Sequence, residues 1–289
     1  ISWHDGVHEL KDCMRRHAPS IYPVLQSKLL KLVAYLCQEG LHQDKVGIVD
    51  IGWHGTMQTS IRAALSSAGY EPMIYGRYAG LGPAAQRNRV HTGWMEAAFW
   101  NDYQSFNKGY GLFNNVAIIE NTFSSPEGTT LRYEPQKDKM YPVLSAADEH
   151  KKQHEHLIAP FQDNALNTLK SLTNGETHNG ITSHDVTINA AMAAINRLGL
   201  SPTENEIATI GHIQHAGSLG HASMVPIVPE FSEGLTSDQT VDLDHSDWVV
   251  GSVLTTLQRA EDQQKRNKLA DHFRRQLSHY DSRTLGQFK

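Results

Sequence analysis

Residues 45–58, KVGIVDIGWHGTMQ, decide how the fold of this chain begins. The run VGIVDI at residues 46–51 is short, apolar and β-branched, so it predicts a buried strand of the kind found in parallel sheets. The glycine-bearing stretch that follows predicts a tight turn. Residues 57–68 then carry apolar side chains at helical spacing, which predicts a helix that Gly69 ends.

A second strand is predicted at residues 73–79, MIYGRYA. Strand, glycine turn, helix and strand in this order form a βαβ unit, in which the strands are parallel and the crossover is right-handed. Before this unit, residues 21–39 carry leucines and valines at helical spacing and predict an amphipathic helix that Gly40 ends. The expected fold class is therefore α/β, with a Rossmann-like βαβ start.

The chain up to residue 144 predicts further short elements: a third strand near 90–95, a short helix at 114–122, a loop at 124–128, and a hairpin of 129–133 and 139–143 around 135–138. After residue 145 the pattern is helical, with helices over 157–172 and 183–199, one that begins at SPTE with Ser201 as its cap, and one capped by Asp244 or Ser246. We therefore predict an α/β ligand-binding half, residues 1–144, and a helical C-terminal half, residues 145–289.

Composition excludes some classes of function. The chain has 26 Lys+Arg against 31 Asp+Glu, a net charge of −5, which is unlike a plain basic nucleic-acid binder. No stretch approaches the roughly 20 apolar residues of a membrane span. Cys13 and Cys37 form no CxxC pair, so buried free thiols in a cytoplasmic protein are expected. The chain begins ISW, without Met or a signal region, which indicates a part of a longer protein.

The segment at residues 50–56, named here the 50–56 turn, is the candidate binding site. It follows a predicted strand and opens a helix, where open α/β sheets bind ligands because the first helical amides are unpaired. Gly52 and Gly55 let the backbone approach a ligand closely, and Thr56 is able to cap the helix or donate to a phosphate. We expect a phosphorylated sugar or nucleotide-sugar here, with phosphate on the backbone up to Gln58 and Asp50 on a hydroxyl or on a metal ion such as magnesium.

Trp53 and His54 complete the expected ligand contacts of the 50–56 turn. The alternative is architectural: the glycines make a tight strand-to-helix connection, and Trp53 packs over it. Two familiar phosphate motifs do not apply, because a P-loop needs a Lys after its last Gly and a dinucleotide fingerprint needs three glycines as GxGxxG.

Glu120 and Glu127 flank the loop that follows the predicted short helix. Together with Asp50 they are the candidate catalytic residues, because glycosyl transfer needs carboxylates as acid and base. Solvated loop carboxylates are the alternative interpretation. Arg77 is a candidate partner for a diphosphate, since a guanidinium forks onto phosphate, and Arg87 and Arg89 are weaker candidates of the same kind.

Metal and phosphatase signatures are incomplete. His150 and His154 are four residues apart, but the Glu of an HExxH zinc motif is missing, so no metal ligands are assigned. A haloacid-dehalogenase phosphatase uses a strand-end Asp-x-Asp-Gly-Thr run. Asp50 is suitably placed for this chemistry, yet Gly52 replaces the second Asp and the Gly-Thr pair comes two residues late. A degenerate phosphatase is therefore a further alternative.

Four segments in order resemble a module of bacterial surface-polysaccharide proteins: DIGWxGTMQ at 50–58, YGxYxG at 75–80, FSSPEGT at 123–129 and WxxGS at 248–252. In those proteins the module follows a haloacid-dehalogenase-like domain or accompanies glycosyltransferase domains, in chains described as hydrolases. The resemblance covers residues 20–255. It implies cytoplasmic glycan assembly, of capsule or lipopolysaccharide, and an upstream catalytic domain as partner. The alternative function is a non-catalytic scaffold module of a larger hydrolase or glycosyltransferase.

Overall fold

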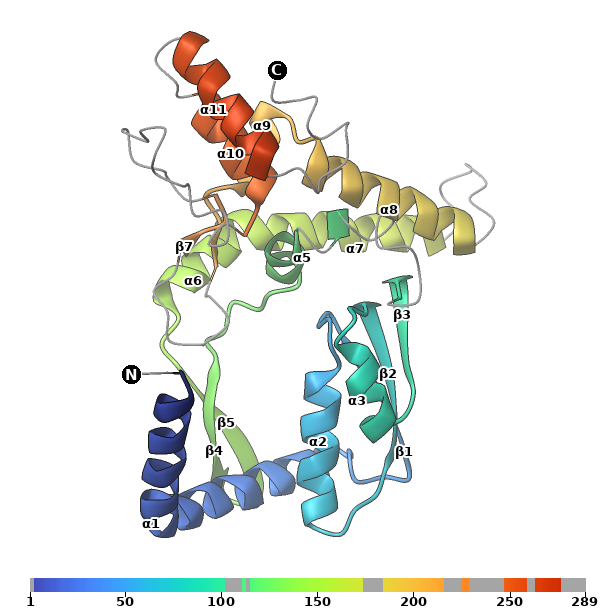
Figure 1. The fold of residues 1–289 in the computed structure, drawn as a ribbon. Helices are drawn as coiled ribbons and strands as arrows, with labels where there is room; N and C mark the ends of the chain where they lie inside the picture. Colours follow the sequence, from blue (N-terminus) through green and yellow to red (C-terminus); the bar gives the residue numbers. More distant parts are fainter. Residues whose placement is uncertain are drawn as a thin grey trace.

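The computed structural model describes residues 3–101, 111–112, 115–173, 184–215, 225–228, 247–258 and 263–276. A parallel sheet in the order β1-β2-β3 forms the first part of the fold (Figure 1). Its strands are β1 (Lys45–Asp50), β2 (Met73–Gly80) and β3 (Met95–Trp100), joined by α2 (Thr56–Ser67) and α3 (Ala85–Thr92). The predicted βαβ unit and the α/β fold class are confirmed, because β1 pairs in parallel with β2.

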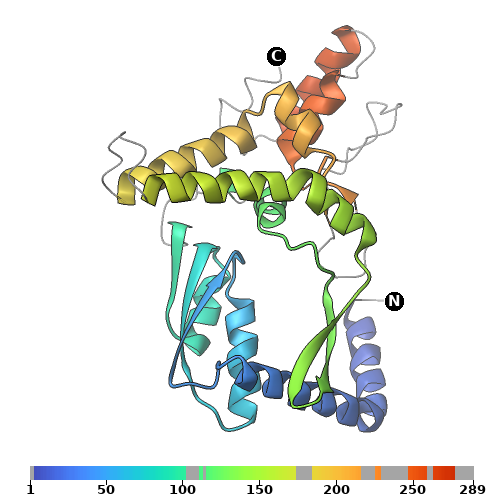
Figure 2. The same cartoon turned by 180° about the vertical axis from the view of Figure 1, so that it is seen from behind.

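One face of this sheet is covered by α2 and α3, as the two opposite views show (Figures 1 and 2). Tyr78 of β2 and Met95 of β3 are buried against Ala85 of α3. The side chain of Val49 in β1 is 89% exposed. The prediction of a buried first strand is therefore wrong. The β-branched run identifies a strand, but the burial of a strand depends on which other parts of the chain cover it, and β1 is an edge strand of the described sheet.

The third strand lies later than predicted. Residues 85–92 form α3, and the strand begins only at Met95. Gly93 separates the two elements with a φ of +94°, a left-handed conformation that favours glycine. Residues 90–95 therefore span a helix end and a turn, and the apolar side chains at this junction do not continue one strand.

Helix α1 (Trp3–Gln38) is longer than the predicted helix at 21–39 and includes Pro19 and Pro23. Proline lacks an amide proton and its ring clashes with the preceding turn, which bends helices. Figure 1 shows this bend between the first and second parts of α1. The second part packs on α2, where Val33 and Leu36 contact Leu65.

The predicted hairpin is confirmed as β4 (Thr130–Gln136) and β5 (Lys139–Leu144), with a tighter turn than expected. Helix α1 crosses this hairpin. The ring of Tyr35 stacks on Tyr133 with centroids 4.5 Å apart. Beyond it, Gln38 donates to the carbonyl of Met140 at 3.1 Å and accepts from its N–H at 2.7 Å.

The later part of the chain is mainly helical, with α5 preceding the hairpin. Its elements are α5 (Val116–Thr122), α6 (Asp148–Gln153), the π-helical turn η1 (His154–Ile158), α7 (Ala159–Thr173), α8 (His184–Leu200), α9 (Glu204–Ile210), β6 (Gln214–His215), β7 (Val225–Pro226), α10 (Val249–Gln258) and α11 (Gln263–Gln276). Trp248, Ile207 and Ile158 form their core together with Ile118 of α5. A domain boundary near residue 145 stays a prediction.

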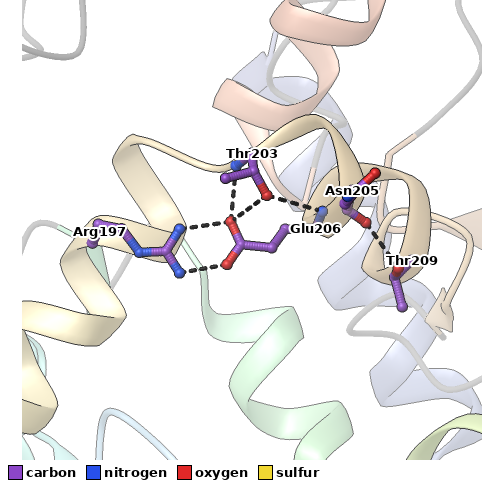
Figure 3. Close-up of polar contacts among 5 residues, drawn as sticks. All are labelled: Arg197, Thr203, Asn205, Glu206 and Thr209. Carbon is purple, nitrogen blue, oxygen red and sulfur yellow. Dashed lines mark hydrogen bonds and ion pairs between the residues drawn. The ribbon is translucent and has the colours of Figure 1, made fainter.

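Helix α9 begins two residues later than the sequence predicts, because Thr203 is the cap instead of Ser201. The Thr203 Oγ1 accepts the Glu206 N–H at 3.3 Å, and the Glu206 carboxylate accepts the Thr203 N–H at 2.8 Å (Figure 3). The guanidinium of Arg197 in α8 forks onto both oxygens of Glu206. This guanidinium is the main cause that lowers the pKa of Glu206 to about 2, and hydrogen bonds from Thr203 add to the effect. The predicted caps at residue 183 and at Asp244 or Ser246 lie outside the described residues.

Two expectations drawn from composition concern the burial of the cysteines and segments that could span a membrane. Cys13 is exposed and Cys37 is half-buried, so the expectation of buried thiols is wrong for Cys13. Cys13 lies in α1. None of the helices in the described ranges combines the length and the apolar character that a membrane crossing requires.

Candidate functional site

The 50–56 turn lies at the carboxyl edge of the parallel sheet, where β1 ends and α2 begins. Figure 2 shows the ends of the three strands pointing toward the helical part of the chain. Gly55 precedes α2 with a φ of +69°, which a side chain would strain. The turn therefore lies where the sequence predicts it, and one of its two glycines is required by backbone conformation.

Helix α2 begins without a side-chain cap. Its first amide with a backbone acceptor is that of Thr59, which donates to the carbonyl of Gly55 at 3.1 Å. The N–H groups of Thr56, Met57 and Gln58 have no acceptor among the described residues. Unpaired amides at the positive end of a helix attract anions. Thr56 is exposed, so this helix end is open to solvent on its outer side.

The side chain of Gln58 is fully buried and anchors the start of α2. Its Nε2 donates to the carbonyls of Ile74 at 3.1 Å and of Thr92 at 3.3 Å, and its Oε1 accepts from the hydroxyl of Tyr78 at 2.9 Å. A Cβ at Gly76 would lie 2.1 Å from this Oε1, so the absent side chain makes room for the amide. The whole residue is buried, so its side chain is an internal anchor, and a ligand role for the Gln58 backbone N–H stays a prediction.

The indole of Trp53 is a core element, with 8% of the residue exposed. It packs in one cluster with Trp100, Leu112 and Met192. Its Nε1 donates to Oε1 of Glu120 on α5 at 3.1 Å. The architectural interpretation therefore applies to Trp53, whose ring connects the carboxyl edge of the sheet to α5 and α8.

Asp50 begins the turn, Glu120 accepts a hydrogen bond from Trp53 within it, and both carboxylate residues are half-buried. The Oδ1 of Asp50 accepts the N–H of Gly52 at 2.7 Å, so the carboxylate folds back over the turn. Burial raises the pKa of Tyr78, and the negative charge of Asp50 raises it further. The predicted pairing of Asp50 with Glu120 is thus indirect: Gly52 contacts one carboxylate, and Trp53 contacts the other.

The structure does not bring Glu127 and Arg77 to the turn through any described contact. Glu127 is exposed in the loop before the hairpin, where Ser125 Oγ donates to its Oε2 at 3.3 Å. Arg77 pairs with Glu96 at 2.5 Å and lies 5.0 Å from the centroid of the Trp94 ring. As the neighbour of Tyr78 in a strand, Arg77 points to the opposite face of the sheet. Ligand roles for Glu127 and Arg77 stay predictions.

Asn88 of α3 is a site residue that the sequence reasoning missed. Its Nδ2 donates to the carbonyl of His54 at 2.7 Å and thereby holds α3 beside the turn. Arg87, its exposed neighbour, is on the same short helix. The polar run around Asn88 has no periodicity that singles it out. Tyr78, the other missed residue, did have a signal, because it is part of the segment YGxYxG at 75–80.

The site does not fit a dedicated metal centre. Among the described residues, no group of three His, Cys, Asp or Glu side chains is close enough to bind a metal ion. Magnesium is commonly bound by one or two carboxylates together with the phosphates of a ligand, so an ion at Asp50 would have to arrive with the ligand. His150 and His154 contact the carbonyls of Ser125 at 2.8 Å and Ser124 at 3.0 Å, which is a structural role in fastening that loop.

No protein-family model matches the chain, and no curated protein sequence matches it. The resemblance of its four motif segments to a module of surface-polysaccharide proteins therefore stays a prediction. The geometry of the 50–56 turn is the basis on which a function can be argued.

Proposed function

We propose that this chain binds a phosphorylated sugar or nucleotide-sugar at the 50–56 turn and serves cytoplasmic bacterial glycan assembly, of capsule or lipopolysaccharide. One observation carries the proposal: α2 begins uncapped, with the N–H groups of Thr56, Met57 and Gln58 lacking acceptors among the described residues. These amides lie at the carboxyl edge of a parallel sheet, where α/β proteins bind phosphate. The proposed glycan setting rests on the resemblance of the motif segments.

We assign each part of the ligand to particular residues around these amides. Phosphate oxygens accept from the first amides of α2 and from the exposed hydroxyl of Thr56. The sugar lies toward Asp50, whose Oδ1 already accepts the Gly52 N–H, which leaves Oδ2 for a sugar hydroxyl. The carboxylate of Glu120, oriented by the indole of Trp53, lines the far side. We assign Arg87, which is exposed on α3, to a second phosphate of a nucleotide-sugar.

The test uses isothermal titration of the chain with UDP-glucose, glucose 1-phosphate and glucose. We expect both phosphorylated probes to bind and glucose alone to bind far more weakly. Thr56→Asp places a carboxylate at the helix start, which stabilises the helix but competes for the same amides. It should weaken binding about tenfold or more, a change of roughly 1.4 kcal/mol.

Ser60→Asp is the matched control, since Ser60 is exposed on the same helix and lies one turn away from the free amides. It should leave the affinity within about twofold. If neither phosphorylated probe binds, or if Thr56→Asp binds as tightly as the unaltered chain, the helix start is not a phosphate site.

A second candidate function is a scaffold module that docks an upstream hydrolase or glycosyltransferase domain. It is favoured by the open face of the sheet, where Val49, Met73 and Trp94 are exposed. Purely parallel sheets normally have both faces covered. Hydroxyl-radical footprinting tests this function: Met73 and Trp94 should be reactive in the chain alone and protected when a hydrolase or glycosyltransferase domain is docked on it, and equal reactivity would exclude docking there.

The third candidate function is a degenerate phosphatase, and its only support is the position of Asp50 at the end of β1. Position 52 is glycine, so the second carboxylate of that chemistry is missing. A carboxylate that accepts the neighbouring Gly52 N–H at 2.7 Å is also folded back toward its own turn. No described contact favours this third alternative over the first two.

A further inference from the structure

A groove of about 600 Å³ lies between α1 and β4, and none of the residues of the 50–56 turn lines it. Its walls are Pro23, Val24, Ser27, Lys28, Lys31 and Leu32 of the helix and Thr130, Leu131, Arg132, Tyr133 and Glu134 of the strand. Successive residues of a strand point to opposite faces. A groove lined by consecutive residues of β4 and by none of β5 therefore runs along the free edge of the strand.

The backbone of β4 presents hydrogen-bonding groups to this groove. In an antiparallel hairpin, residues alternate between positions that bond across the ladder and positions whose N–H and C=O point outward. Gln136 and Lys139 close the turn, and Tyr133 lies opposite Pro142, which has no N–H. The register therefore places Tyr133 at an outward position. On the other edge, the equivalent groups of Met140 are already bonded to Gln38.

The groove is lined by apolar side chains and carries a net positive charge. Lys31 Nζ lies 2.6 Å from Oε2 of Glu134, and Arg132 Nε lies 3.1 Å from Oε1, so two cations share one carboxylate. Lys28 is exposed and has no ion-pair partner among the described residues. The lining thus carries a net charge of +2, from three cations and one carboxylate. Beside them, the apolar side chain of Leu131 is 50% exposed.

We propose that this groove binds an extended acidic peptide segment of another protein, which adds to β4 as a further strand between the hairpin and α1. Main-chain bonds to Tyr133 supply affinity, apolar side chains lie toward Val24 and Leu131, and carboxylates lie toward Lys28, Lys31 and Arg132. Strand addition to an exposed sheet edge is an established mode of peptide recognition. An edge strand with free backbone groups is otherwise prone to aggregate. This proposal is independent of the function proposed for the 50–56 turn.

The first test measures fluorescence anisotropy with labelled eight-residue peptides. One alternates glutamate with valine, one alternates lysine with valine, and two glutamate peptides carry N-methyl groups at either the odd or the even amides. The unmethylated glutamate peptide should bind and the lysine peptide should not. One methylated peptide should lose about tenfold in affinity or more while the other keeps it, because only one edge of an added strand faces β4.

The second test uses variants of the chain and hydrogen exchange. Lys28→Glu should weaken binding of the glutamate peptide about tenfold, whereas Lys152→Glu, at an exposed position of α6, should not change it. The amide of Tyr133 should exchange more slowly when the peptide is bound. Failure of the glutamate peptide to bind, equal affinity of both methylated peptides, or binding to anionic lipid vesicles without binding to the peptide would each overturn the proposal.

Discussion

The hydroxyl of Tyr78 donates a 2.9 Å hydrogen bond to Oε1 of Gln58, and both side chains are buried. Gln58 lies in the first turn of α2, and Tyr78 lies in β2 directly opposite Asp50. This bond therefore fastens the start of the helix to the strand beside the 50–56 turn. The position of the unpaired amides at the helix start therefore depends on a buried contact behind them.

Tyr78→Phe should destabilise the chain by roughly 1–3 kcal/mol, because it leaves the buried Oε1 of Gln58 without its donor. Urea unfolding followed by circular dichroism measures this change. Tyr75→Phe is the control, since Tyr75 is exposed on the open face of the same strand, and it should change the free energy of unfolding by less than about 0.5 kcal/mol. Equal effects of the two substitutions would mean that the Tyr78 hydroxyl contributes nothing.

Gly80→Ala should also be destabilising, by roughly 1–3 kcal/mol, because an added methyl group overpacks the core. A Cβ at this position would lie 2.8 Å from the Trp53 ring and 2.9 Å from Leu112. Gly47→Ala in β1 meets no atom within 4 Å and should be nearly neutral. Thermal unfolding of both variants checks the difference, and a Gly80→Ala chain as stable as the Gly47→Ala chain would contradict the close packing of Trp53.

The Glu206 carboxylate should make stability depend on pH below pH 5. Its pKa is lowered from 4.5 to about 2 in the folded chain, chiefly by Arg197. A lowered folded pKa adds stability above the unfolded pKa, and this stability is lost as the pH falls from 4.5 toward 2. Since both side chains are partly exposed, the contribution of the ion pair is about 1 kcal/mol or less.

Urea unfolding at pH 5.5 and at pH 3.5 tests this dependence on the unaltered chain and on Glu206→Gln. The unaltered chain should lose more stability between these two conditions than the variant does, because glutamine does not titrate. Identical losses would show that the network of Arg197, Thr203 and Glu206 does not persist in solution.

Lys31 should control the titration of Glu134 in the peptide groove. The Lys31 hydrogen bond is the main cause that lowers the pKa of Glu134, with Arg132 adding to it. Lys31→Gln should therefore move this pKa upward toward its ordinary value, as carbon-detected NMR titration of the carboxylate would show. Lys28→Gln, which removes a cation without a described contact to Glu134, should produce a smaller shift. A larger shift in Lys28→Gln would contradict the assignment of partners.

Much of the first part of the fold follows from local patterns. The run at 46–51, the glycine turn and the helical spacing at 57–68 predict β1, the turn and α2 to within one or two residues. Periodicity works here because each pattern lies within one element. It fails at 90–95, where a helix end and a turn produce an apolar pattern without forming one strand. It also fails at Thr203, because which hydroxyl caps a helix depends on where the chain enters it.

The sequence by itself determined the strand, the tight turn and the position of the helix start, since these depend on residues that are neighbours in the chain. Only the tertiary structure decided that Trp53 is packed in the core by Trp100 and Met192, that Gln58 is an anchor, and that Asn88 bonds to His54. Burial and hydrogen-bond partners are set by residues distant in sequence, which a pattern along one segment does not encode. The position of the helix-start amides in the candidate site therefore follows from the local sequence. The contacts that hold these amides in place are set by the tertiary structure.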